Sequence, residues 1–163
     1  MSEPEVLEEQ NFPRAGLFRR LAALIYDMFL VAAIWMLLGF IFQQIFGIEN
    51  QVIDGRVMTD PVADNLLFIL MILSCFTFYS WFWMRSGQTL GMLAWRIRVK
   101  SIEEGKINFT QALVRFLAAW PAFLMLGLGY FWIFFDDQGD AVHDKLSYSK
   151  VIVLPKSYSP FNS

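Results

Sequence analysis

Hydrophobic residues form three long runs in this chain, at about residues 21–46, 66–84 and 112–135. The charged residue inside the first run is Asp27, and the second run has none. The second run also lacks the polar stripe that a surface helix of a soluble protein keeps toward water. About twenty helical residues cover the roughly 30 Å of a membrane's hydrocarbon core. The pattern therefore predicts an all-α membrane protein with three hydrophobic helical segments.

A period of two replaces the helical pattern between the second and third runs. The sequence WRIRVK at 95–100 alternates apolar and basic residues, EEGK at 103–106 supplies a turn, and Ile107 and Phe109 resume the alternation. A second β-branched run, SKVIVLP, begins at Ser149. We therefore expect a small cytoplasmic β-hairpin or sheet, stabilised by a third strand if residues 151–154 pair with residues 96–100.

The third hydrophobic run leaves two topologies open. A single crossing is the simpler arrangement for about twenty apolar residues, but it would place the last strand across the membrane from the hairpin. Pro121 and the sequence GLG at 127–129 are points where a helix can bend. A kinked, re-entrant segment would return the chain to the side of the hairpin.

Composition and charge agree with a membrane protein and suggest its orientation. The 163 residues are 56% hydrophobic and 17% aromatic, which exceeds the usual content of soluble domains. Lysine and arginine lie before the first run and between the second and third, whereas residues 47–65 are mainly acidic. The positive-inside rule then predicts a multi-pass protein with a cytoplasmic N-terminus. We expect its membrane to be the bacterial inner (plasma) membrane. We expect residues 1–13 to be disordered, 14–154 to form the membrane domain and 155–163 to be a flexible tail.

Three charged residues at the hydrophobic runs are candidates for a polar cluster. Arg20 and Asp27 share one helical face but are seven residues apart, too far to pair within the helix, and Arg115 lies near the start of the third run. A carboxylate near the centre of a membrane helix costs about 2.5–3.5 kcal/mol on insertion scales. We therefore expect Asp27 to pair with an arginine from another helix, Arg115, or with Arg20. Such a pair either fixes helix packing or marks an ion or proton site.

The sequence HDKLS at 143–147 contains the single histidine, His143, next to Asp144. A neighbouring carboxylate would raise the pKa of His143 above its ordinary value of about 6.5, as a pH sensor requires; a structural His–Asp cap is the alternative. No second histidine or cysteine lies at metal-ligand spacing, and no nucleotide-binding or nucleophile motif is found. We expect no metal, no cofactor and no enzymatic activity, and the absence of a basic stripe argues against nucleic acid.

Three stretches together resemble the RDD family of small membrane proteins: FRRLAALIYD from residue 18, GQTLGMLAWRIRVKSIEEGKINFTQALVRF from 87, and AVHDKLSYSKVIV from 141. The family is named for an arginine and two aspartates. The resemblance assigns these to Arg20, Asp27 and Asp144, and it assigns a T-x-G loop turn to Thr89 and Gly91 and a further arginine to Arg115. Two positions depart from the family pattern: Tyr148–Ser149 replaces a common Gly-Thr, and Met92 replaces a common lysine or arginine.

The resemblance implies two kinds of function. Sodium–proton antiport has been proposed for some relatives, which implies a subunit for ion or small-solute transport by cation/proton exchange. Because three helices cannot enclose an aqueous path, this hypothesis requires a homo-oligomer. A eukaryotic branch implies instead a non-transporting scaffold or assembly factor that binds another membrane protein.

Overall fold

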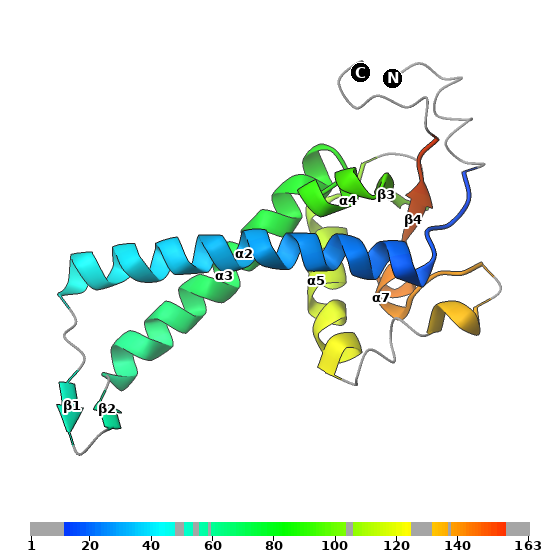
Figure 1. Cartoon of the computed structure of the whole chain (residues 1–163). Coiled ribbons are helices and arrows are strands. Elements are labelled where there is room, and N and C mark those ends of the chain that lie inside the picture. Colours follow the sequence, from blue (N-terminus) through cyan, green and yellow to red (C-terminus); the bar gives the residue numbers. More distant parts are fainter. Residues whose placement is uncertain are drawn as a thin grey trace. The chain divides into compact units, whose positions relative to one another are not determined.

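The computed structural model of the chain describes residues 12–47, 51–53, 56–58, 60–103, 106–124, 132–136 and 138–155. The elements follow in the order α2 (Leu17–Phe46), β1 (Gln51–Ile53), β2 (Arg56–Met58), α3 (Pro61–Arg85), α4 (Leu90–Ala94), β3 (Ile97–Ser101), α5 (Phe109–Leu124), the 3₁₀ turn η1 (Trp132–Phe134), α7 (Val142–Leu146) and β4 (Ser149–Val153) (Figure 1). The chain forms two compact units, residues 28–78 and residues 1–27 with 79–163. Each unit is described by itself.

Residues 28–78 contain the later part of α2, the β1–β2 hairpin and the earlier part of α3. The hairpin is antiparallel, with Val52 opposite Val57. Helix α3 begins at Pro61, a residue suited to the first helical position, and the Asp60 carboxylate accepts a hydrogen bond from the Val62 amide at 2.9 Å. The Trp35 indole N–H donates to the main-chain carbonyl of Met71 at 3.0 Å, which ties α2 to α3 within this unit.

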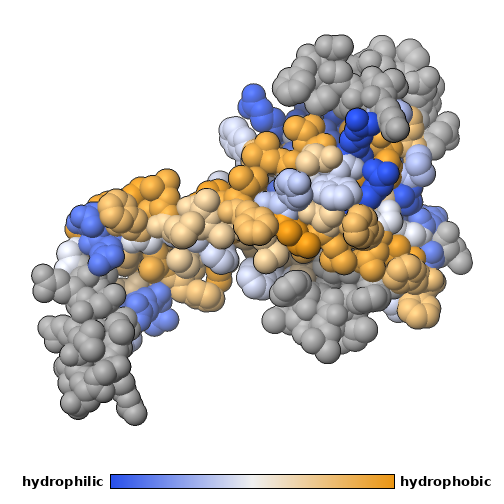
Figure 2. All heavy atoms as spheres, in the orientation of Figure 1, coloured by the Kyte–Doolittle hydropathy of each residue, from blue (hydrophilic) through white to orange (hydrophobic). Residues whose placement is uncertain are grey.

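Helices α2 and α3 are long and apolar enough to cross a membrane. Their 30 and 25 residues correspond to lengths of about 45 Å and about 37 Å. In the most apolar 18-residue stretch of each helix, the buried share is only 17% in α2 and 11% in α3. The core helix of a soluble protein is mostly buried. Large side chains such as Phe29, Met36, Phe40 and Phe68 are exposed, and Figure 2 shows hydrophobic residues along the visible face of α2. These two helices confirm the first two predicted segments.

The third predicted segment is not confirmed as a spanning helix. Its described beginning forms α5, which has 16 residues and contains Pro121. The predicted bend at 127–129 lies outside the described residues. Within the described ranges, α2 and α3 alone have the length and hydropathy of a span.

The predicted long-range strand pairing is confirmed. Strands β3 and β4 are antiparallel, with Val99 opposite Val151. Paired strands lie side by side, so this pairing favours the alternative in which the chain returns to the side of the hairpin over a single crossing by the third run. The chain returns to β3 after α5.

The predicted local hairpin through Ile107 and Phe109 is wrong. Phe109 is the first residue of α5, and Asn108 and Gln111 exchange the two hydrogen bonds of a capping box. The Gln111 amide donates to Asn108 Oδ1 at 2.8 Å, and the Asn108 amide donates to Gln111 Oε1 at 3.1 Å. This helix start overrides the period-two pattern of the sequence.

The sheet has a main-chain neighbour at each edge. The Val153 amide donates to the Pro13 carbonyl at 2.8 Å; residues 1–11 of the segment expected to be disordered lie outside the described part. At the other edge the Val99 amide donates to the Gly87 carbonyl at 2.8 Å. The buried face of the sheet centres on Ile97, Val99 and Val151.

The pairs α4–β3 and α7–β4 are two copies of one helix–strand motif. In each, a five-residue helix is followed by a C-cap residue, a residue with positive φ and a five-residue strand. The positive-φ residues are Arg96 at 52° and Tyr148 at 48°. The Val99–Val151 pair lies at the middle of both strands, so an approximate two-fold axis relates the copies. Tyr148 therefore occupies a left-handed conformation that favours glycine.

Candidate functional site

Two buried carboxylates, Asp27 and Asp144, define two separate sites in the unit formed by residues 1–27 and 79–163. Asp27 comes from α2 and meets the N-terminus of α4. Asp144 comes from α7 and meets two arginines. The five residues of the predicted polar cluster are therefore divided between the sites rather than joined in one.

Asp27 is held by hydrogen-bond donors at the start of α4. The Thr89 hydroxyl donates to Asp27 Oδ2 at 2.5 Å, and the Gly91 amide donates to Oδ1 at 2.9 Å. Thr89 is the N-cap of α4, and its Oγ1 also accepts from the Met92 amide at 3.2 Å. The first amides of a helix lack partners within the helix and carry partial positive charge, so a carboxylate there is stabilised.

Gly91 allows this close approach. A β-carbon at position 91 would overlap the carbonyl oxygen of Ala23 in α2 and would lie 2.9 Å from Asp27 Oδ1. Thr89 and Gly91 are therefore the N-terminal turn of a short helix docked on α2, and not the loop turn that we expected.

The expected ion pair between Asp27 and an arginine is wrong. Within the described residues, both Arg20 and Arg115 pair with Asp144. The donors that Asp27 uses instead are a hydroxyl and a main-chain amide. A hydropathy and charge pattern shows cations but does not show a main-chain N–H, which explains the error.

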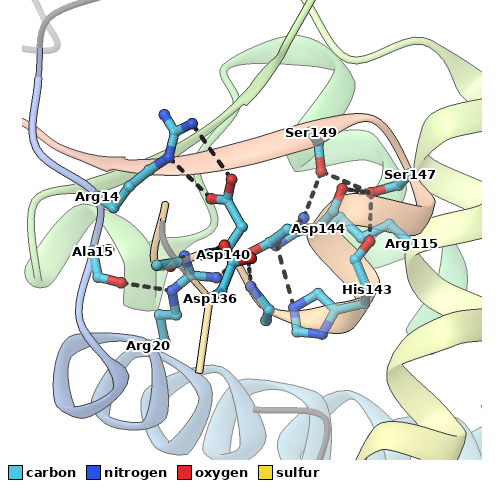
Figure 3. A network of polar contacts seen from close by, with 12 residues as sticks. Arg14, Ala15, Arg20, Arg115, Asp136, Asp140, His143, Asp144, Ser147 and Ser149 are labelled. Atoms are coloured by element: carbon cyan, nitrogen blue, oxygen red, sulfur yellow. Dashed lines mark hydrogen bonds and ion pairs between the residues drawn. The ribbon is translucent and has the colours of Figure 1, made fainter. Parts of the chain in front are cut away.

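Asp144 joins three helices and the sheet (Figure 3). Its Oδ2 accepts from Arg20 Nη1, and from the Ala141 amide at 3.0 Å as the N3 carboxylate of α7. Its Oδ1 accepts from Arg115 Nη1 at 2.5 Å. Arg115 also donates to Ser149 Oγ of β4 at 2.7 Å. The carboxylate thus links α2, α5, α7 and, through Arg115, β4.

The electrostatics of this site keep Asp144 ionised and His143 neutral. Burial by itself would raise the pKa of Asp144, but Arg115 and Arg20 outweigh it and hold this pKa well below its usual range. Burial lowers the pKa of His143 to about 3, and the two arginines lower it further against the opposing effect of Asp144. The expectation of a His143 pKa above its ordinary value is therefore wrong: Asp144 does raise this pKa, but burial lowers it by more.

Two further ion pairs that the sequence did not lead us to expect lie beside this site (Figure 3). Arg14 Nε lies 3.0 Å from Asp140 Oδ1, and Lys145 pairs with Asp136, whose carboxylate also accepts from the Asp140 amide at 2.9 Å. The Lys145 ammonium holds the pKa of Asp136 below its ordinary value. The sequence DDQGD was a signal, since acidic residues around a glycine favour a turn. In the described ranges, no three His, Cys, Asp or Glu residues are arranged to hold a metal ion.

His143 should make the protein sensitive to mild acid. As pH falls, the unfolded chain protonates its histidine near pH 6.5 while the folded chain does so only near pH 3, so stability is full above pH 6.5 and is lost below it. Between pH 6.5 and 5.0 the expected loss is about 1.5 kcal/mol. Unfolding midpoints of the wild type and of His143→Gln in detergent, measured across this range, test the prediction. Because the chain has one histidine, equal pH slopes in the two proteins would contradict it.

Comparison with known protein families finds one family whose model covers both sites. The model of the RDD family matches residues 14–148, a range that includes Arg20, Asp27, Arg115 and Asp144. No curated protein and no solved structure is significantly similar to the chain.

Proposed function

Because this chain belongs to the RDD family, we propose that it is a transport subunit that exchanges a cation for protons across the bacterial inner membrane, with Asp27 as the proton-binding carboxylate. The single observation that carries this proposal is the environment of Asp27. It is buried on a helix long and apolar enough to span a membrane, and the described contacts give it two hydrogen-bond donors and no cationic side chain. Ionisable groups in such positions are typical of ion and proton pathways.

The contacts of Asp27 suit both protonation states. When Asp27 is ionised, the Thr89 hydroxyl donates to Oδ2 and the Gly91 amide donates to Oδ1. When Oδ2 carries a proton, its O–H donates to Thr89 Oγ1 instead, because a hydroxyl is both a donor and an acceptor. The Gly91 bond is unchanged. The site thus takes up or releases a proton with little movement, whereas Asp144 is fixed as an anion by its arginines.

The proposal includes a multi-pass topology with a cytoplasmic N-terminus. Contacts of aromatic and arginine residues at the ends of both long helices support this topology. The Phe18 and Trp95 rings meet edge to face, Arg19 donates to the Trp95 carbonyl at 3.2 Å, and the Arg85 guanidinium lies 5.6 Å from the centre of the Trp81 ring. Tryptophan and arginine are enriched at membrane interfaces, and clustered basic residues favour the cytoplasmic side. Two or three helices cannot enclose an aqueous path, so the proposed transporter is a homo-oligomer.

Replacing Asp27 by asparagine should abolish exchange without unfolding the protein. Asparagine imitates the protonated acid: its oxygen accepts from Gly91 and its amide donates to Thr89. We expect proton-coupled cation flux in proteoliposomes to fall at least about a hundredfold, the lower end of the range that loss of a proton-transferring group causes. Asp60→Asn is the matched control, because Asp60 is an exposed helix cap and asparagine caps equally well. Unchanged flux in Asp27→Asn, at equal incorporation, would remove Asp27 from the mechanism.

The large exposed apolar surface of α2 and α3 favours a second candidate, a scaffold that binds another membrane protein. This function predicts that Asp27→Asn and Arg115→Gln both reduce recovery of the complex and that the wild type shows no flux. Crosslinking and pull-down from native membranes separate the candidates. Isolation of the wild type without a partner would argue against the scaffold.

A further inference from the structure

Three buried hydrogen-bond donors at α3 and α5 have no acceptor among the described residues. They are Ser80 Oγ, Trp83 Nε1 and Arg115 Nε, and their residues are 3%, 6% and 3% exposed. Ser80 and Trp83 are three residues apart and therefore lie on one face of α3. The guanidinium carbon of Arg115 lies 5.2 Å from the centre of the Trp83 ring, which places α5 against this face. An unsatisfied buried donor is destabilising, so its presence calls for a ligand.

The balance of charges around Arg115 indicates whether that ligand is a cation or an anion. Two buried guanidinium groups, of Arg20 and Arg115, share the one carboxylate of Asp144. His143 is neutral because its pKa is low. The neighbouring pairs Arg14–Asp140 and Lys145–Asp136 are each balanced internally. The buried cluster therefore carries one positive charge in excess, and excess buried charge is costly unless it is compensated.

We propose that Ser80, Trp83 and Arg115 bind a small monovalent anion, with chloride as the probe. A single bound anion accepts a hydrogen bond from all three donors and neutralises the excess charge of the two arginines. The site is separate from Asp27 and does not depend on the proposed cation exchange.

A water molecule fits this environment less well than an anion does. A buried water donates two hydrogen bonds as well as accepting others, so it needs acceptors. Trp83 Nε1 and Arg115 Nε are donors only, and Ser80 Oγ is the one group of the three that also accepts. The near-complete burial of all three residues favours a small, dehydrated ion over a bulky organic anion.

Thermal unfolding of the purified full-length chain in sodium chloride and in sodium gluconate, at equal ionic strength, tests the site. We expect a saturable rise of the unfolding midpoint with chloride and none with gluconate. Ser80→Ala and Trp83→Phe each remove one donor to the anion and should weaken the apparent chloride affinity about tenfold. Each variant is compared with itself in the two salts, so a lower baseline stability does not affect the result.

Two substitutions serve as matched controls. Trp81→Phe changes an exposed ring next to Arg85, and Ser74→Ala removes a hydroxyl that already donates to the Met71 carbonyl at 2.8 Å. Both should keep the wild-type chloride response. Equilibrium binding of radioactive chloride to the wild type should give one ion per chain. Equal midpoints in both salts, no bound chloride, or a full response in Ser80→Ala and Trp83→Phe would each overturn the proposal.

Discussion

The Asp144→Asn variant is expected to lose about 3–5 kcal/mol of unfolding free energy. Asparagine keeps the size of the side chain and one acceptor oxygen, but it leaves the guanidinium groups of Arg20 and Arg115 without their shared counter-charge. Breaking a buried ion pair by removing one partner is costly because the remaining charge stays buried. Denaturant unfolding in mixed micelles, followed by tryptophan fluorescence, measures the loss.

Two further variants separate unpaired charge from altered packing. Asp140→Asn should cost only about 1 kcal/mol, since its partner Arg14 is 24% exposed and water compensates its charge. Adding Arg20→Met to Asp144→Asn should recover part of the loss, because one buried charge fewer remains unpaired. A double variant that is less stable than Asp144→Asn alone would show that packing around Arg20 dominates, contrary to the prediction.

The arginine and the two aspartates that the resemblance assigns to the family's name thus have two different physical roles here. Arg20 and Asp144 form the buried ion pair that, with Arg115, joins α2, α5, α7 and β4. Asp27 belongs to a different contact, between α2 and α4. Asp144→Asn should therefore lower the amount of folded protein, whereas Asp27→Asn should leave that amount nearly unchanged and, under the proposed function, reduce flux.

Features that depend on local pattern could be predicted from the sequence. The helices Leu17–Phe46 and Pro61–Arg85 cover the predicted segments 21–46 and 66–84, because continuous hydrophobicity over a span length has few other solutions. The pairing of β3 with β4 follows from two β-branched runs that each need a neighbour. Arg20 and Arg115 were singled out because they lie next to apolar runs, and Asp144 because it follows the single histidine and fits the family resemblance.

Features that depend on three-dimensional context could not be predicted. The alternation at Ile107 and Phe109 continued the period-two pattern of the preceding strand, but the Asn108–Gln111 capping box starts a helix there instead. The low pKa of His143 comes from burial, which the adjacent Asp144 in the sequence does not reveal. The partner of Asp27 includes a main-chain amide, which every residue type except proline offers.

Gly91→Ala should lower the free energy of unfolding by about 3 kcal/mol, the upper end of the usual cost of overpacking. The added methyl group would overlap the Ala23 carbonyl oxygen, and main-chain atoms of a long helix move less easily than the end of a side chain. Helix α4 would have to withdraw from α2, which would also lengthen the Gly91–Asp27 hydrogen bond. Denaturant unfolding should therefore show lower stability, and proteoliposomes should show reduced flux.

The control for Gly91→Ala is Gly39→Ala in α2, where an added β-carbon meets nothing within 4 Å. This change should be neutral or should stabilise the helix by up to about 1 kcal/mol, because alanine is the better helix former. Ala23→Gly should not rescue Gly91→Ala, since the obstacle is the main-chain oxygen of residue 23 rather than its methyl group. Rescue by Ala23→Gly, or equal stability of Gly91→Ala and the wild type, would contradict the close contact between α4 and α2.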